Sequence, residues 1–263
     1  MNYQQLCMKA CETAKEAGGL IRGEASVFSS GRIEEKGLHN FVSYVDKGAE
    51  KQIVEALSQL LPEAGFITEE GTNSTQGERF NWVIDPLDGT TNFIHGLSPC
   101  AVSIGLLENC RPVAGVVYEV SLDECFYAWK DSAAYLNGKV IHVSNRASVQ
   151  DGLIATGFPY CDYHRMRSYI DCLEYFLRNS HGVRRLGSAA TDLAYVACGR
   201  FEAFYEYGLN PWDVAGGLFI LQQAGGKVSD FSGGDNYIFG KEMVAANALV
   251  FDEFLNTVRK YLK

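Results

Sequence analysis

The sequence lacks the features that mark membrane-bound and secreted proteins. No apolar run among its 263 residues reaches the roughly 18 positions that a membrane-spanning helix requires. In residues 1–19, charged and polar side chains interrupt any continuous apolar core of a secretion signal. The eight cysteines form no Cys-x-x-Cys pair. We therefore expect a reduced, cytoplasmic protein with no membrane partner.

Basic residues are few relative to acidic ones. Lysine and arginine total 23 against 32 aspartates and glutamates, which gives a formal net charge of −9. Nucleic acids and anionic membranes attract proteins of the opposite charge balance. The composition therefore argues against nucleic acid as the main partner. It also means that an anionic substrate would need divalent cations to offset the protein's own carboxylates.

Two common catalytic motifs are missing as well. The chain has no Gly-x-Ser-x-Gly nucleophile elbow and no Gly-x4-Gly-Lys-[Ser/Thr] loop. These absences disfavour serine hydrolases and P-loop nucleotide enzymes. The five histidines show no spacing typical of metal ligands.

The apolar content, 47% of all residues, is ample for a full core. In the first half, apolar side chains recur at helical spacing from residue 3 to 17, and we expect this helix to end at Gly18-Gly19. A second helix is expected over 47–61, stopped by Pro62. Further expected elements are strands at 65–68 and 81–84 and an antiparallel meander over 101–136, followed by a hairpin at Asn137-Gly138.

After about residue 145 the pattern changes to alternating strands and helices. The expected strands cover 153–156, 183–186, 201–205 and 244–246, and the expected helices cover 163–177, 189–197, 211–224 and 250–262. No flexible linker separates the two halves. We therefore predict an N-terminal α+β domain over 1–145, with an antiparallel sheet, packed tightly on a C-terminal α/β domain over 146–263.

The most informative segment runs from Trp82 to Phe93. An apolar strand delivers Asp85 to its carboxyl end, where Pro86 is expected to force a turn. Asp88 follows three residues later, so the two carboxylates can face one point and offer the oxygen ligands that Mg²⁺ prefers. Residues 90–92 are typical of a helix start whose N–H groups bind phosphate. The same pattern also describes a plain surface turn; the preceding strand and the pair of hydroxyls are what favour a site.

Four further acidic residues stand next to apolar elements. Glu69 and Glu70 follow the strand expected at 65–68, Asp213 lies in the first turn of the helix expected at 211–224, and Asp46 follows an apolar stretch. Each has a simpler explanation. Paired glutamates are usually solvated, Asp213 suits capping of its helix, where the dipole favours negative charge, and Asp46 suits a helix N-cap. Each signal is weak alone, and the combination is specific.

Together these motifs resemble the lithium-sensitive, magnesium-dependent inositol monophosphatase superfamily. Residues 85–93 match its first signature, and residues 212–226 match its second, Trp-Asp-x-Ala-x-Gly running into Ala-Gly-Gly. Residues 33–46 fit its lysine-then-Val-Thr-x-x-Asp pattern, and residues 187–190 fit a fourth motif. The resemblance covers nearly the whole chain. It implies the α+β / α/β class, a layered αβαβα sandwich of the inositol monophosphatase and fructose-1,6-bisphosphatase type, and a homodimer.

The resemblance also implies two to three Mg²⁺ ions in each site. The first ion is expected on Glu69, Asp85 and the carbonyl oxygen of Leu87. The second is expected on Asp85, Asp88 and Asp213, and a third, looser ion near Glu69 through water. Paired Mg²⁺ ions clamp the attacking and leaving oxygens and lower the pKa of bound water. The implied reaction is therefore direct attack by water, without a protein nucleophile.

The same resemblance implies catalytic and substrate-binding residues. Thr90, hydrogen-bonded to Asp46, is expected to orient the attacking water, and Glu69 is expected to take part in catalysis. The backbone N–H groups of Gly89 and Thr90 are expected to hold the phosphate. The implied substrate-binding residues are Asp88, Gly89, Thr90, Ala189, Glu206 and Asp213.

The implied activity is hydrolysis of a phosphate monoester on a small polyol. Residues 88–93 favour inositol monophosphate, because the nucleotidase branch tends to carry a lysine after the first threonine. Fructose-1,6-bisphosphatase, histidinol-phosphatase and 3′(2′),5′-bisphosphate nucleotidase stay open, as does a regulatory binding protein on the same scaffold. Asn40 stands where many members carry aspartate. The pair Arg184-Arg185 fits either a substrate contact or a subunit interface.

Overall fold

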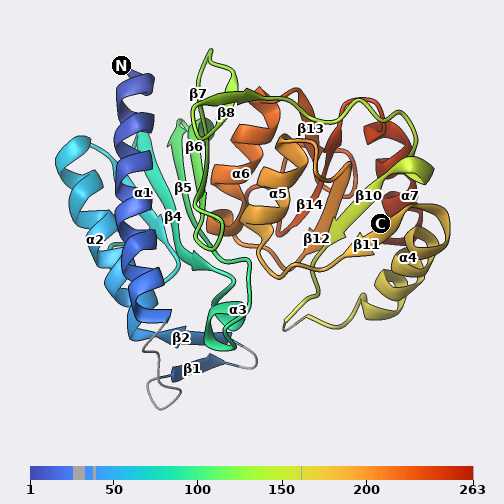
Figure 1. The fold of residues 1–263 in the computed structure, drawn as a ribbon, viewed down its shortest axis with the longest axis horizontal. Coiled ribbons are helices and arrows are strands. Elements are labelled where there is room, and N and C mark those ends of the chain that lie inside the picture. The colour runs from blue at the N-terminus through green and yellow to red at the C-terminus, as the bar shows by residue number, and fades with distance from the viewer. Residues whose placement is uncertain (26–32, 38–39, 161, 263) are drawn as a thin grey trace.

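Five alternating layers of helices and sheets make up the molecule. A computed structural model describes residues 1–25, 33–37, 40–160 and 162–262, with the backbone alone at 33–37 and 40–43. The helices are α1 (Tyr3–Ala25), α2 (Tyr44–Leu60), α3 (Thr90–Ile94), α4 (Met166–Asn179), α5 (Ala189–Ala197), α6 (Pro211–Gln223) and α7 (Phe251–Leu262). Figure 1 shows α1 and α2 on one side of a seven-stranded sheet, α5 and α6 between the two main sheets, and α4 and α7 outside the five-stranded sheet. This order confirms the expected αβαβα sandwich.

The first sheet has the strand order β3-β4-β5-β6-β7-β8-β9. Strand β3 runs parallel to β4, and every other neighbouring pair is antiparallel, as the meander predicted. The strands are β3 (Gly65–Thr68), β4 (Phe80–Asp88), β5 (Ala101–Glu108), β6 (Arg111–Glu119), β7 (Glu124–Trp129), β8 (Ala134–Leu136) and β9 (Lys139–Ile141). A separate two-stranded sheet joins β1 (Ile33–Gly37) to β2 (Asn40–Ser43).

Small residues let α6 lie directly on the first sheet. Gly105 of β5 stands opposite Gly115 of β6. A Cβ atom on Gly115 would lie 2.3 Å from the carbonyl oxygen of Gly216 in α6, and a Cβ on Gly105 would lie 2.8 Å from the Cβ of Ala215. The backbones therefore touch without side chains between them.

The second main sheet has the order β11-β10-β12-β14-β13. Strand β10 is parallel to both β11 and β12, whereas β14 is antiparallel to β12 and β13. These strands are β10 (Leu153–Thr156), β11 (Gly182–Arg184), β12 (Ala203–Tyr207), β13 (Gly226–Ser229) and β14 (Glu242–Asn247). Strand β13 was not among the expected elements. None of the helices in the described residues combines the length and hydrophobicity that crossing a lipid bilayer requires.

The expected end of the first helix is wrong. Helix α1 continues through Gly18-Gly19 to Ala25. The reason is packing, because a Cβ on Gly18 would lie 2.2 Å from Cε1 of Tyr118, and the apolar face continues to the fully buried Ile21. Gly18 therefore permits close contact between the helix and the sheet instead of ending the helix.

Two details around the candidate acids also differ from expectation. Strand β4 does not turn at Pro86; it continues to Asp88, with a register shift against β5 between Asp85 and Asp88. The bulge accommodates the proline, which has no N–H to donate to the ladder. Asp46 lies within the first turn of α2, not at its N-cap. The side chain of Asn40 lies outside the described residues.

Candidate active site

Strand β4 carries two acids to one pocket. Asp85 is 1% exposed, and its Oδ1 accepts a hydrogen bond of 2.9 Å from the N–H of Leu87. The register shift interrupts the alternation of side chains along the strand, and Asp85 and Asp88 line the same pocket. Gly89 follows with a φ of 93°, where a Cβ would lie 3.0 Å from the carbonyl oxygen of Pro99. Glycine is therefore required at this turn.

Helix α3 begins directly after that glycine. The hydroxyl oxygen of Thr90 lies 3.0 Å from Oδ1 of Asp46 and 2.9 Å from the carbonyl oxygen of Leu87, and it donates its one proton to one of these acceptors. Gly89, Thr90 and Thr91 line the pocket beside the two acids. The expected pairing of Thr90 with Asp46 is therefore present in the structure.

Glu69 reaches the pocket from the neighbouring strand. It follows β3, and its N–H donates to the carbonyl oxygen of Ile84 at 3.2 Å, next to Asp85 on β4. Burial raises the pKa of Asp85 well above its ordinary value, and the carboxylate of Glu69 raises it further. Two parallel strands that end side by side thus bring their acids together.

Asp213 arrives from the second half of the chain. Asp85 pairs with Ser103 across the sheet, and the Ser103 hydroxyl donates to the carbonyl oxygen of Trp212 at 3.2 Å. This contact brings the start of α6 beside β4. The N–H of Asn210 donates to Oδ2 of Asp213 at 2.6 Å, so Asp213 has the capping role that the simpler interpretation proposed and also lines the pocket.

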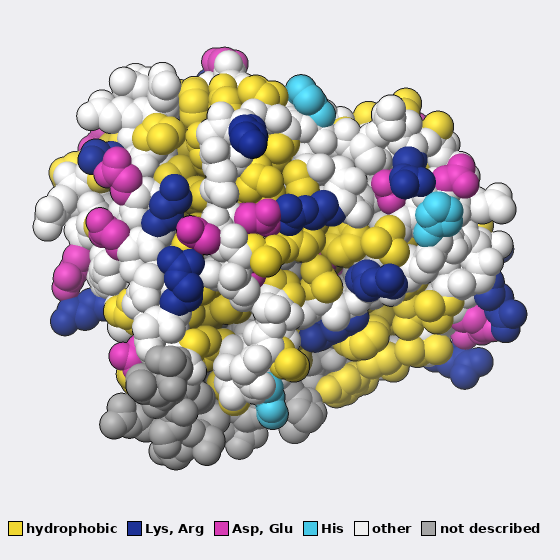
Figure 2. All heavy atoms as spheres, in the orientation of Figure 1, with side chains coloured by type: hydrophobic (Ala, Val, Ile, Leu, Met, Phe, Trp, Pro, Cys, Tyr) yellow, Lys and Arg dark blue, Asp and Glu magenta, His cyan; other side chains and the backbone are white. Residues whose placement is uncertain are grey.

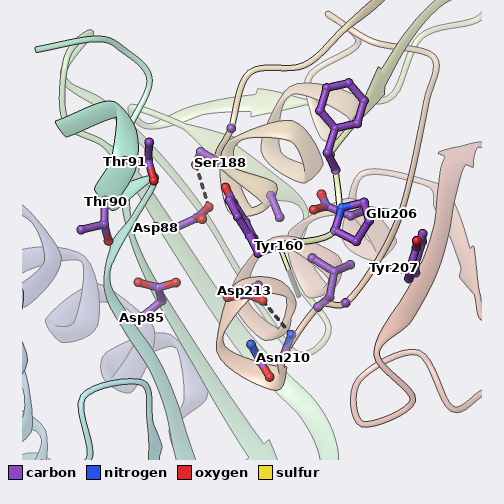
Figure 3. A pocket seen from close by; sticks show the side chains of 18 of the residues that line it. Asp85, Asp88, Thr90, Thr91, Tyr160, Ser188, Glu206, Tyr207, Asn210 and Asp213 are labelled. Carbon is purple, nitrogen blue, oxygen red and sulfur yellow. Dashed lines mark hydrogen bonds between the residues drawn. The ribbon is translucent and has the colours of Figure 1, made fainter. Parts of the chain in front are cut away.

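Asp88 is held by the start of α5. Its Oδ2 accepts hydrogen bonds from the Ser188 hydroxyl at 2.6 Å and from the Ala190 N–H at 2.7 Å. Figure 3 shows Asp88 pointing towards Ser188, with Asp85 and Asp213 nearby. Burial raises the pKa of Asp88 to about 6, and the bonds from Ser188 and Ala190 oppose that rise. Sequence reasoning missed Ser188 and Ala190 as partners of this acid.

Glu206 and Arg185 line the same pocket. Glu206 is 8% exposed, and its carboxylate occupies space left by Gly157, where a Cβ would lie 2.0 Å from the carboxylate atoms. Burial raises the pKa of Glu206 to about 8, and the charge of Arg185 opposes that rise. An Nη of Arg185 donates to the Tyr160 hydroxyl at 2.9 Å, while the buried Nε has no partner among the described residues.

The pocket that joins these residues has a volume of about 340 Å³. Its lining includes Glu69, Asp85, Leu87, Asp88, Gly89, Thr90, Ala189, Glu206 and Asp213, which are all of the predicted site residues except Asp46. Asp46 is fully buried and joins the site through Thr90. Arg185 lines the pocket as well, whereas its neighbour Arg184 is exposed and bonds to the carbonyl of Val183.

The donor set suits a hard divalent cation. Burial and mutual repulsion raise the pKa values of Asp85 and Asp213 well above normal, and a cation between them would remove that penalty. Within the described part of the chain, no three Asp, Glu, His or Cys side chains already stand together as a finished metal centre. Each of Asp85, Asp88 and Asp213 instead accepts bonds from protein donors. Carboxylate oxygens without soft donors match Mg²⁺.

The five-layered sandwich thus carries an acid-lined pocket to which both halves of the chain contribute. A family model described as the inositol monophosphatase family matches residues 2–262. The chain belongs to this family.

Relatives carry two kinds of name. The Nus factor SuhB of Pseudomonas aeruginosa is 39% identical over 96% of this chain and 95% of its own. The inositol-1-monophosphatase of Mesorhizobium japonicum is 37% identical over 95% of each chain. Among solved structures, the extragenic suppressor protein suhB of Bartonella henselae has a TM-score of 0.88 at 37% identity, over 95% of this chain and 96% of that one. An inositol monophosphatase from Anabaena has a TM-score of 0.87 at 31% identity, over 99% and 98%.

Proposed function

We propose that this protein is a Mg²⁺-dependent phosphatase that hydrolyses a phosphate monoester on a small polyol, inositol monophosphate foremost. The observation that supports it is the meeting of four acids, Glu69, Asp85, Asp88 and Asp213, in one pocket beside Gly89. The test is phosphate release from inositol 1-phosphate as Mg²⁺ is added, removed with a chelator and restored. Release that needs no divalent cation would overturn the proposal.

The acids have the role of metal ligands in this proposal. Glu69, Asp85 and the carbonyl of Leu87 form one set, and Asp85, Asp88 and Asp213 form the other, for two to three ions in all. When bound, Mg²⁺ supplies charge neutralisation and an acidified water. Without it, four carboxylates would repel a phosphate dianion from the pocket.

The other residues near the phosphate position the reactants. The Thr90 hydroxyl, fixed against Asp46, orients the attacking water. Glu69, which lines the same pocket, accepts the proton of that water. The backbone N–H groups of Gly89 and Thr90, at the start of α3, hold the phosphate oxygens. Positioning and charge stabilisation carry most of the acceleration in phosphoryl transfer, so no protein nucleophile is required.

The alcohol part of the substrate lies between Glu206 and Arg185 in this arrangement. A buried carboxylate accepts hydrogen bonds from hydroxyl groups, and a guanidinium donates to them. The N–H of Ala189 and the carboxylate of Asp213 offer further contacts. We therefore assign Arg185, left open between substrate and interface by the sequence, to the substrate side on the strength of its position in the pocket.

A substrate panel discriminates within the superfamily. Inositol 1-phosphate, fructose 1,6-bisphosphate, histidinol phosphate, glycerol 2-phosphate and adenosine 3′,5′-bisphosphate should be compared by kcat/KM. Preference for inositol 1-phosphate supports the proposal. Preference for one of the others would assign the chain to that branch while leaving the metal-dependent chemistry intact.

We also infer a cytoplasmic homodimer with the site shared between domains 1–145 and 146–263. Figure 2 shows one face of the molecule, on which hydrophobic side chains gather where α4 and β11 lie. Three apolar side chains in or just before α4 are exposed: Tyr163 by 45%, Ile170 by 42% and Leu177 by 58%. Contact with a second subunit would remove this apolar surface from water. Charges of both signs are scattered over the same face, which suits neither nucleic acid nor a membrane. Light scattering on the purified protein tests the dimer.

A second role is supported by the name of the relative from Pseudomonas aeruginosa, a Nus factor. A protein of this family can carry a binding role together with, or in place of, catalysis. The test uses a Pseudomonas strain that lacks its own relative. This chain is expressed there in two versions, the wild type and Asp88→Asn. Growth restored by both would support a role independent of catalysis, and growth restored by neither would count against it.

A further inference from the structure

Helix α2 carries two buried acids on one face. Asp46 and Glu50 are separated by one turn, so their side chains point the same way, and both are 0% exposed. The contact of Asp46 with Thr90 explains why this carboxylate is buried. The proposed reaction does not use Glu50, and the sequence analysis did not single it out.

Glu50 binds the loop that follows β3. Its Oε2 accepts a hydrogen bond of 2.8 Å from the N–H of Glu70, and its Oε1 accepts one of 2.8 Å from the N–H of Thr72. Both carboxylate oxygens are therefore used on backbone groups of one short loop. Gly71, between the two donors, has a φ of 73°, and the chain turns there so that both N–H groups face the helix.

This loop carries Glu69, the candidate metal ligand from β3. On its N-terminal side, Glu69 is fixed by the sheet, because its own N–H donates to the carbonyl of Ile84. On its C-terminal side, the chain is held by the hydrogen bonds that the N–H groups of Glu70 and Thr72 donate to the carboxylate of Glu50. The direction of the Glu69 side chain is thus set from both sides.

We propose that Glu50 is a positioning residue that holds the 69–72 loop so that Glu69 faces Asp85, and that it thereby sets the metal affinity of the site. This rests on the proposed function. Helix α2 then positions two residues that line the pocket. It holds Thr90 through Asp46, and it holds Glu69 through Glu50. Groups that orient metal ligands typically change metal affinity by about 10- to 100-fold when they are mutated.

A purely structural role for Glu50 makes a different prediction. If the carboxylate only accepted hydrogen bonds from two amides, its replacement would lower the stability of the protein, but the folded protein would bind metal as before. Metal affinity of the folded protein, measured without substrate, separates the two roles. Catalytic activity alone would not.

The experiment compares Glu50→Gln with Glu55→Gln on the exposed side of the same helix. Glutamine keeps the length of the side chain but replaces one acceptor with a donor that faces an N–H group. Mn²⁺ binding, followed by electron paramagnetic resonance without substrate, should weaken by about tenfold or more in Glu50→Gln and stay unchanged in Glu55→Gln. The Mg²⁺ concentration for half-maximal activity should rise in parallel, with KM at saturating Mg²⁺ nearly constant.

Mn²⁺ affinity within twofold of wild type in a folded Glu50→Gln protein would overturn the proposal. If that variant does not fold, Glu50→Asp keeps the charge but is too short to reach both amides, and it must show the same loss of affinity. Failure of the wild type itself to bind Mn²⁺ would instead reject the proposed function, and the role of Glu50 with it. If the wild type binds Mn²⁺ and the Glu50 variant binds it equally well, only the positioning role of Glu50 is rejected.

Discussion

The hydroxyl of Ser188 lies 2.6 Å from Oδ2 of Asp88, and this bond joins the start of α5 to the end of β4. The two residues are 100 positions apart in the chain. The second half of the molecule therefore orients an acid that the first half supplies. The proposed metal site depends on this bond because Asp88 has to direct its carboxylate to the pocket.

Replacing Asp88 tests the site directly. Asp88→Asn removes a charge but preserves the shape and one acceptor for Ser188, so the fold should persist. Mg²⁺-dependent phosphate release should fall by about 100-fold or more, as when charge stabilisation is removed from other transition states. Asp252→Asn, at a position with an 81% exposed side chain, is the matched control. Unchanged turnover in Asp88→Asn would refute the assignment.

Lithium should inhibit the enzyme. Li⁺ is close to Mg²⁺ in size and carries half the charge, so it should replace the more weakly held ion without activating water. We expect loss of activity at millimolar Li⁺, measured as phosphate release beside equal concentrations of Na⁺ as control. Equal rates in the two salts would favour another branch of the superfamily.

Arg185 should affect the alcohol part of the substrate and not the phosphate. Arg185→Met should raise KM for the preferred polyol phosphate by roughly tenfold, the loss expected for one charged hydrogen bond. Turnover of p-nitrophenyl phosphate, which has no hydroxyl groups for Arg185, should change little. Arg184→Met, one residue away and exposed, should leave both substrates unaffected. A change in oligomeric state without a change in KM would assign Arg185 to the interface.

Without metal, the protein should lose stability as the pH rises. Burial raises the pKa of Glu206 to about 8 and of Asp88 to about 6, so the folded state holds protons that the unfolded state has released. Their favourable contribution is complete below the unfolded values near 4 and is lost as the pH passes the folded values. Between pH 5 and 8 we expect a loss of roughly 5 kcal/mol in the free energy of unfolding.

Urea unfolding in the presence of a chelator measures this loss. Glu206→Gln should flatten the pH dependence above pH 6, because the amide does not titrate. Added Mg²⁺ should restore stability at pH 8. A chelated protein whose stability rose steadily from pH 5 to 8 would contradict the prediction.

Gly18 and Gly19 should respond in opposite ways to the same change. Gly18→Ala inserts a methyl group into the ring of Tyr118 and should destabilise the protein by about 1–3 kcal/mol. Gly19→Ala meets no atom within 4 Å and should stabilise α1 by about 0.5–1 kcal/mol. Thermal unfolding of both variants checks the pair. Equal effects would show that the helix does not pack as described.

The sequence predicted best what is local. Strands β3 and β10 and helix α5 have the bounds that residue pattern alone suggested, and the segment from Asp85 to Phe93 already held the acids and the start of α3. The acids could be found because the chemistry of metal binding restricts residue types. Asp213 could be found only through its motif, since its capping role looked sufficient by itself.

What the sequence did not predict depends on contacts between distant segments. Gly18-Gly19 carries a stop signal for a helix, and only the ring of Tyr118 explains why the helix continues. Pro86 carries a stop signal for a strand, and the bulge against β5 overrides it. Ser188 is an ordinary helix cap until the fold brings Asp88 to it.

The closeness of α6 to the first sheet has a consequence for synthesis of the chain. A nascent polypeptide that has reached only Leu136 contains Glu69, Asp85 and Asp88, but Asp213 and the helix that rests on Gly105 and Gly115 are still to be made. In the proposed mechanism such a fragment has the first set of metal ligands, but its second set lacks Asp213, and it hydrolyses nothing. Enzymatic activity therefore reports completed assembly, and mixing the two separately expressed halves should regenerate it only if α6 can still dock.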